Sequence, residues 1–170
     1  MRRFIRIALA LILATGILIL VACSGRTSAQ MVIDSPAPDF KLSNLEGQTV
    51  SLSSFLGNPV FINFWTTTCG PCVEEMPYLQ QIQNDWASKG LIILSIDLGE
   101  DTDRVKNFIR SHNYTFPVLL DSQYEVAGKY NVRYTPTSIF IDTEGKIKAD
   151  IIGAFKNTAS IEKEIKTLIH

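Results

Sequence analysis

Hydrophobic residues follow two kinds of pattern along the chain, and together these predict alternating strands and helices. Short runs that are apolar on both faces, such as residues 59–65 and 91–96, are typical of strands buried in the middle of a sheet. Between such runs, apolar residues recur every three or four positions, as in a helix with one buried face. The expected strands are 59–65, 91–96, 116–120, 138–141 and 147–151, and the expected helices are 69–89, 101–112, 122–130 and one carrying Ile161, Ile165, Leu168 and Ile169.

Two segments are expected to form hairpins. Residues 40–42 and 50–52 alternate apolar and polar positions around Gly47, which predicts a small amino-terminal hairpin. Residues 142–145, between the last two expected strands, predict a second one. Strands that alternate with helices and end in a hairpin and a helix indicate an α/β domain, with a mixed sheet flanked by helices.

The first 22 residues differ from the rest of the chain. Seventeen of them are apolar, and three arginines precede an uncharged apolar run from Ile7 to Ala22. This pattern predicts a secretory signal peptide, because sixteen helical residues at about 1.5 Å each fall short of a hydrocarbon core about 30 Å thick. An uncleaved membrane anchor remains the alternative, since Phe4 and Ile5 add apolar residues before the run.

Setting the leader aside changes the charge balance. The whole chain carries 16 Lys and Arg against 17 Asp and Glu; three arginines belong to the leader, so residues 23–170 carry 13 against 17, a net charge of −4. A mildly acidic domain offers no basic surface, so no nucleic-acid partner is expected. The expected organisation is a signal peptide over 1–22, a flexible tether of small polar residues over 23–35, and one domain over 36–170.

Cys69 and Cys72 form a C-x-x-C directly after a predicted buried strand and at the start of a predicted helix. Free N–H groups and the positive end of the helix dipole stabilise a thiolate there. We expect Cys69, in the first turn, to be the exposed attacking thiol and Cys72, which lies deeper, to resolve the mixed disulfide. A bridge across two residues constrains the unfolded chain very little, so this pair is expected to perform chemistry rather than to hold the fold.

Two other uses of a C-x-x-C fit the sequence poorly. A zinc site needs about two more ligands, and the only histidines, His112 and His170, show no ligand spacing. Covalent haem attachment requires a histidine where Val73 stands. No metal and no cofactor are therefore expected, and both histidines are expected at the surface.

Four motifs resemble the thioredoxin superfamily, and in particular the membrane-anchored TlpA/ResA-like thiol–disulfide oxidoreductases. They are P-A-P-D-F at 36–40, N-F-W-T-T-T-C-G-P-C at 63–72, E-E-M-P at 74–77 and Y-T-P-T at 134–137. The resemblance covers about residues 36–170. It implies a thioredoxin fold with an amino-terminal hairpin, a central αβ insertion over 101–121, and a monomer.

The resemblance also implies which residues contact a substrate. Pro136 is expected to be a cis-proline facing the disulfide. Thr135, the residue before it, would offer its backbone to an extended substrate strand. Trp65 is expected to be a third substrate-binding residue.

A buried acid is expected near the resolving thiol. Thioredoxins carry an aspartate where this chain has Asn63, which cannot exchange a proton. The resemblance places the acid at Glu75 instead, where burial would raise its pKa so that it could accept the proton of Cys72. Glu74 is expected to face solvent. Gly-Pro between the cysteines, the dipeptide of thioredoxin, favours a reducing couple.

The end of the leader resembles the lipobox of bacterial lipoproteins. Leu20-Val21-Ala22-Cys23 places a small residue before a cysteine, and in that family the peptidase cuts there and the thiol carries diacylglycerol. The resemblance implies that Cys23 binds the lipid bilayer and that the domain faces the extracytoplasmic side of the cell membrane.

The leading hypothesis is a membrane-anchored protein-disulfide reductase. The family resemblance implies apocytochrome c as a substrate, during cytochrome c maturation, and a membrane thiol carrier as electron donor. A peroxiredoxin-like thiol peroxidase is the alternative, because P-A-P-D-F also resembles peroxiredoxin openings and Thr66 precedes Cys69 by three residues; however, Ile62 stands where the peroxidatic motif has proline. A non-enzymatic lipoprotein binding module is a third possibility, against which the intact C-x-x-C argues.

Overall fold

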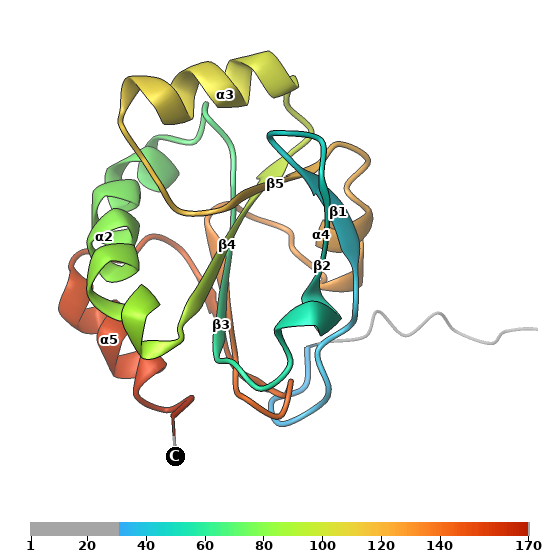
Figure 1. Cartoon of the computed structure of the whole chain (residues 1–170), viewed down its shortest axis with the longest axis vertical. Coiled ribbons are helices and arrows are strands. Elements are labelled where there is room, and N and C mark those ends of the chain that lie inside the picture. Colours follow the sequence, from blue (N-terminus) through green and yellow to red (C-terminus); the bar gives the residue numbers. More distant parts are fainter. Residues whose placement is uncertain (1–30, 170) are drawn as a thin grey trace, which may run out of the picture.

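A computed structural model, drawn in Figure 1, describes residues 31–169 of the chain. Its centre is a seven-stranded mixed sheet in the order β2-β1-β5-β4-β3-β6-β7. The strands are β1 (Lys41–Asn44), β2 (Thr49–Ser51), β3 (Val60–Trp65), β4 (Ile92–Leu98), β5 (Val118–Asp121), β6 (Thr137–Ile141) and β7 (Ile147–Ile152). The helices are α2 (Gly70–Trp86), α3 (Thr102–Ser111), α4 (Glu125–Lys129) and α5 (Thr158–Ile165), with 3-10 turns η1 (Leu52–Phe55) and η2 (Ala87–Lys89). The expected α/β order and the mixed sheet are confirmed.

The strand that leads to the cysteines, β3, lies inside the sheet between β4 and β6. All six residues of β3 are buried, as its apolar run predicts. β3 is parallel to β4 and antiparallel to β6, with Phe64 opposite Thr137 and Val60 opposite Ile141. The end of β3 that leads to the C-x-x-C therefore lies beside the start of β6, which follows Pro136.

Two cores cover the two faces of the sheet. Alternate side chains of a strand point to opposite faces, so Phe61 joins one core and Ile62 the other. Residues of α2, α3 and α5 complete the first core, whereas residues of η1 and α4 complete the second. Figure 1 shows this division, with α2 and α5 together on one side of the sheet and α4 on the other.

The amino-terminal hairpin is part of the main sheet. β1 pairs with β2 in antiparallel register, as expected, and its other edge pairs with β5, with Ser43 opposite Leu120. The hairpin therefore covers the edge strand that the insertion over 101–121 contributes.

The segment before the hairpin contacts the far end of the sheet. The Asp34 N–H donates to the Ile147 carbonyl at 2.7 Å, and Pro36 forms an antiparallel bridge with Lys146. Residues 31–35, the part of the predicted tether that the structure describes, thus lie against the domain rather than apart from it. The predicted signal peptide, the tether up to residue 30 and the predicted lipid site Cys23 fall outside the described residues, as does His170.

The last helix is shorter than its apolar spacing suggests. α5 ends at Ile165, and the Leu168 N–H donates to the Ile165 carbonyl at 2.9 Å in a tight turn. Leu168 stays buried, but Ile169 is 44% exposed, so its predicted place in the buried stripe is wrong. Among the helices of the described part, none has both the length and the apolar character to cross a membrane.

Candidate active site

The two cysteines lie at the start of α2 and form a disulfide. Their sulfur atoms are 2.02 Å apart, and the Cys72 N–H also donates to Cys69 Sγ at 3.2 Å. Cys69 is the N-cap of the helix and is half-buried, whereas Cys72 has no exposed surface. Pro71 stands in the first turn, where the helix needs no N–H donor from it. The expected difference in depth is therefore present, and Cys69 is the sulfur that a partner molecule can reach.

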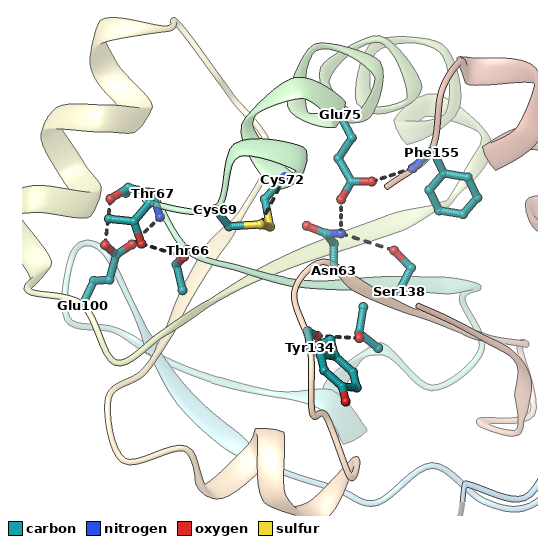
Figure 2. Close-up of a disulfide and its surroundings, with 12 residues drawn as sticks. Asn63, Thr66, Thr67, Cys69, Cys72, Glu75, Glu100, Tyr134, Ser138 and Phe155 are labelled. Atoms are coloured by element: carbon teal, nitrogen blue, oxygen red, sulfur yellow. Dashed lines mark hydrogen bonds between the residues drawn. A yellow bond between two sulfur atoms is a disulfide. The ribbon is translucent and has the colours of Figure 1, made fainter. Parts of the chain in front are cut away.

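Glu75, one turn further along α2, is a buried carboxyl with two donors. Its Oε1 accepts from Asn63 Nδ2 on β3 at 2.7 Å, and its Oε2 accepts from the Phe155 N–H at 2.9 Å, in the loop between β7 and α5. Asn63 Nδ2 also donates to Ser138 Oγ at 3.2 Å. Figure 2 shows this network beside the disulfide.

Burial sets the acidity of this carboxyl. Loss of hydration raises the pKa of Glu75 from 4.5 to about 7, although the donors from Phe155 and Asn63 and the charge of Lys156 oppose the rise. A group that titrates near neutral pH can both take up and release a proton under ordinary conditions. Glu74, its neighbour, is exposed as expected. The predicted buried position and raised pKa of Glu75 are confirmed.

The segment before β6 carries a cis bond between Thr135 and Pro136, as expected. Pro136 is buried, Thr135 is half-buried and Tyr134 is 68% exposed. Thr137 Oγ1 donates to the Tyr134 carbonyl at 2.7 Å. Beside this loop lies a cavity of about 350 Å³, lined in part by Thr66, Tyr124, Tyr134 and Thr135. An extended chain that follows this loop would pass the start of α2.

Trp65 does not contribute to that surface. Its side chain has no exposed area and packs against Phe108 of α3, with ring centroids 5.4 Å apart. The prediction that Trp65 contacts a substrate is wrong for this structure, because the helix of the insertion covers the ring. Its neighbour Thr66 lines the cavity instead.

Sequence reasoning missed a pair of carboxyl groups beside the loop that precedes Cys69. Glu100 accepts two hydrogen bonds from Thr67, one from the backbone N–H and one, at 2.7 Å, from the hydroxyl. Asp97 is 1% exposed and accepts from the Glu100 N–H at 3.2 Å. A signal was available, because the carboxyl ends of parallel neighbours such as β3 and β4 meet at the same edge of a sheet.

The environments of these two carboxyl groups differ. Burial, together with the nearby Glu100 carboxyl, raises the pKa of Asp97 to about 8. Burial acts on Glu100 as well, but the donors from Thr67 outweigh it and hold the pKa of Glu100 below its usual value. At neutral pH, Glu100 is therefore the ionised member of the pair and holds Thr67, two residues before Cys69.

Comparisons with known proteins give a family match, curated relatives and solved structures with a similar fold. Residues 33–150 match the AhpC/TSA family. The thiol-disulfide oxidoreductase ResA of Bacillus cereus is 40% identical over 124 residues, which cover 73% of this chain and 72% of that protein. A thioredoxin-family thiol:disulfide interchange protein from Chlorobium tepidum has a TM-score of 0.74 at 28% identity, over 82% of this chain and 99% of the other. The exposed lipoprotein thioredoxin Etrx1 of Streptococcus pneumoniae has a TM-score of 0.68 at 30% identity, over 77% and 100%.

Proposed function

Because the chain belongs to the AhpC/TSA family and is a ResA-like thiol-disulfide oxidoreductase with a thioredoxin-like fold, we propose that it reduces disulfides of exported proteins through Cys69 and Cys72. The observation that supports these roles is the difference in depth between the sulfurs. Cys69 caps the helix and is partly exposed, whereas Cys72 is fully buried beside it. A partner disulfide can reach only the first.

In the proposed reaction the Cys69 thiolate attacks one sulfur of the substrate disulfide. The other substrate sulfur leaves as a thiolate and takes up a proton, and a mixed disulfide remains. Cys72 then loses its proton, attacks Cys69 Sγ and releases the second substrate sulfur. Two electrons pass to the substrate, and the enzyme ends with the Cys69–Cys72 disulfide that the structure contains.

We propose that Glu75 accepts the proton that Cys72 loses. It is buried one turn further along α2, and its pKa of about 7 lets it accept a proton in one step and return it in another. Asn63 and Phe155 hold both carboxyl oxygens in place. The substrate would lie along the backbone of Thr135 and the cavity beside it.

We place the enzyme outside the cytoplasm, bound to the membrane through a lipid on Cys23. The arginines and apolar run of the leader, followed by a lipobox-like sequence, support this proposal. The similar pneumococcal thioredoxin is itself an exposed lipoprotein. In this setting apocytochrome c, whose cysteines are reduced before haem attachment, is the proposed substrate, and a membrane thiol carrier is the proposed electron donor.

A trapping experiment tests the roles of the cysteines. Cys72→Ser should accumulate a covalent adduct with its substrate in the native membrane, because nothing then resolves the mixed disulfide. The adduct should disappear on treatment with a thiol reductant, and Cys69→Ser should form none. Absence of an adduct with Cys72→Ser, or an equal yield with Cys69→Ser, would contradict the proposal. Identifying the trapped protein by mass spectrometry tests the apocytochrome c assignment.

Labelling tests the anchor separately. Cells given an alkyne fatty acid should label the wild-type chain and leave Cys23→Ser unlabelled. An unlabelled wild-type chain would contradict lipid attachment without affecting the roles of Cys69 and Cys72.

A substrate comparison tests the peroxidase alternative. A disulfide reductase should reduce insulin disulfides much faster than it consumes hydrogen peroxide when both are offered to the same reduced enzyme. The opposite ranking would favour the peroxidase.

A further inference from the structure

The side-chain amide of Asn63 is held in one orientation. Its nitrogen donates to Glu75 Oε1 at 2.7 Å and to Ser138 Oγ at 3.2 Å. When Glu75 is ionised, its carboxylate only accepts hydrogen bonds, so the nitrogen of Asn63 faces Glu75 and the oxygen points the other way. Figure 2 shows Asn63 Oδ1 turned toward the disulfide.

This oxygen is a buried acceptor without a donor. Asn63 has no exposed surface, and no group in the described part of the chain donates to Oδ1. Buried polar atoms without partners are uncommon, and each calls for a physical reason. Disulfide sulfurs carry no hydrogen, so in the oxidised form nothing on that side of the amide can donate.

We propose that Asn63 Oδ1 accepts a hydrogen bond from the Cys72 thiol when the disulfide is reduced, and that this bond keeps Cys72 protonated while Cys69 ionises. Reduction by a dithiol breaks the S–S bond and adds two electrons. The dithiol becomes a disulfide and gives up two protons: one is taken up by Cys72, which becomes a thiol, and the other passes to solvent, so that Cys69 is left as a thiolate. The Cys72 S–H is the donor missing in the oxidised form. The inference rests on the roles proposed above for the two cysteines.

The two sulfurs then have opposite partners. Cys69 Sγ faces a donor, the N–H of Cys72, at the N-terminus of α2. Cys72 is buried and faces an acceptor. A donor stabilises the ionised form of a thiol, whereas an acceptor stabilises the protonated form. Asn63 therefore acts as a positioning residue, which makes Cys69 the first sulfur to attack and delays Cys72 until the mixed disulfide forms.

The same amide connects Cys72 to Glu75. Its carbonyl faces the sulfur while its nitrogen donates to the carboxyl. An aspartate in this position would place a second ionisable group beside Glu75. Asparagine supplies both an acceptor and a donor without adding a charge.

Equilibration of the full-length chain with glutathione tests the inference. Asn63→Leu keeps the branched shape of the side chain and removes its polar atoms. It should shift the equilibrium about fivefold to tenfold toward the disulfide, since one hydrogen bond is lost only in the reduced form; tenfold corresponds to about 30 mV for a two-electron couple. The hydrogen bond from Asn63 to Glu75 exists in both the oxidised and the reduced protein, so its loss does not change the equilibrium between them. Ser138→Ala, the matched control, should stay within about twofold of wild type.

The outcomes separate the two proposals. A wild-type chain that fails to exchange with glutathione would refute the proposed function. If the wild-type chain exchanges with glutathione but Asn63→Leu has the same equilibrium constant as wild type, the inference about Asn63 is overturned and the proposed function stands.

Infrared spectroscopy of the wild-type protein gives a second test that does not depend on a variant folding. The spectrum of the reduced chain minus that of the oxidised chain should show a side-chain carbonyl band that moves to lower wavenumber on reduction. Labelling with [13C]asparagine should shift this band. A difference spectrum without an asparagine band would also overturn the inference.

Discussion

Replacing Glu75 by glutamine should remove a pH dependence from the stability of the oxidised protein. Burial raises the pKa of Glu75 from 4.5 to about 7, so the folded protein retains a proton that the unfolded chain releases near pH 4.5. The stability that this proton contributes is complete below pH 4.5 and is lost as the pH rises through about 7.

The magnitude follows from the two pKa values. The gap between 4.5 and about 7, at about 1.4 kcal/mol for each pH unit, amounts to about 3 kcal/mol. Glutamine is neutral at every pH, so the variant lacks this loss. Its amide can accept from only one of the two donors, Asn63 and the Phe155 N–H. The free energy lost with the second hydrogen bond is the same at every pH. The comparison therefore concerns the slopes of the two curves of unfolding free energy against pH.

Urea unfolding, followed by tryptophan fluorescence from pH 4.5 to 8.5, measures the effect. The disulfide is kept oxidised so that neither cysteine titrates. Between the two ends of the range, the free energy of unfolding of wild type should fall by about 3 kcal/mol relative to that of Glu75→Gln. Glu74→Gln removes the same charge from an exposed neighbour and should follow the wild-type curve. Parallel curves for wild type and Glu75→Gln would refute the reasoning.

Four further substitutions test other contacts by urea unfolding at pH 7. Glu100→Gln leaves one of the two Thr67 donors without an acceptor and should lower the free energy of unfolding by about 2 kcal/mol; Arg104→Gln, which removes a 3.7 Å ion pair with Glu100, should cost less than about 1 kcal/mol. Met76→Ala empties a fully buried position and should cost about 2–5 kcal/mol, and a loss below about 1 kcal/mol would contradict the tight core around it. Asn157→Ala removes the side chain that accepts from the Ser160 N–H at the start of α5 and should cost about 1 kcal/mol; an unchanged stability would show that the cap contributes nothing.

The elements around the disulfide could be predicted because each depends on a local pattern. The apolar run of β3 is buried on both faces, and the helical segment that begins after Cys69 ends at Gly90, which has a φ of 89°. Asp101 caps α3, because its side chain accepts from N–H groups of the first turn. Such signals lie within a few residues of the feature that they determine.

The parts of the site that could not be predicted depend on contacts between distant residues. The donors to Glu75 come from β3 and from the loop after β7, 12 and 80 residues away. Trp65 is covered by α3 of the insertion, and its own sequence context gives no sign of that contact. Residues 31–35 belong to the predicted tether, yet a backbone hydrogen bond to Ile147 holds them against the sheet. A backbone hydrogen bond does not depend on the side chains, so the residue composition of a segment does not predict it.

The contact of Asp34 and Pro36 with the turn between β6 and β7 fixes the point at which the chain leaves the domain toward any preceding anchor. That turn lies at the end of β6, whereas Pro136 and the cysteines lie at its beginning, because Phe64 pairs with Thr137. Five residues of strand at about 3.3 Å each separate the two ends by about 15 Å. An anchor that precedes Asp34 would therefore join the domain at the end of the sheet opposite Cys69. Such a protein would reach disulfides that project well out from the membrane surface before those that lie flat against it.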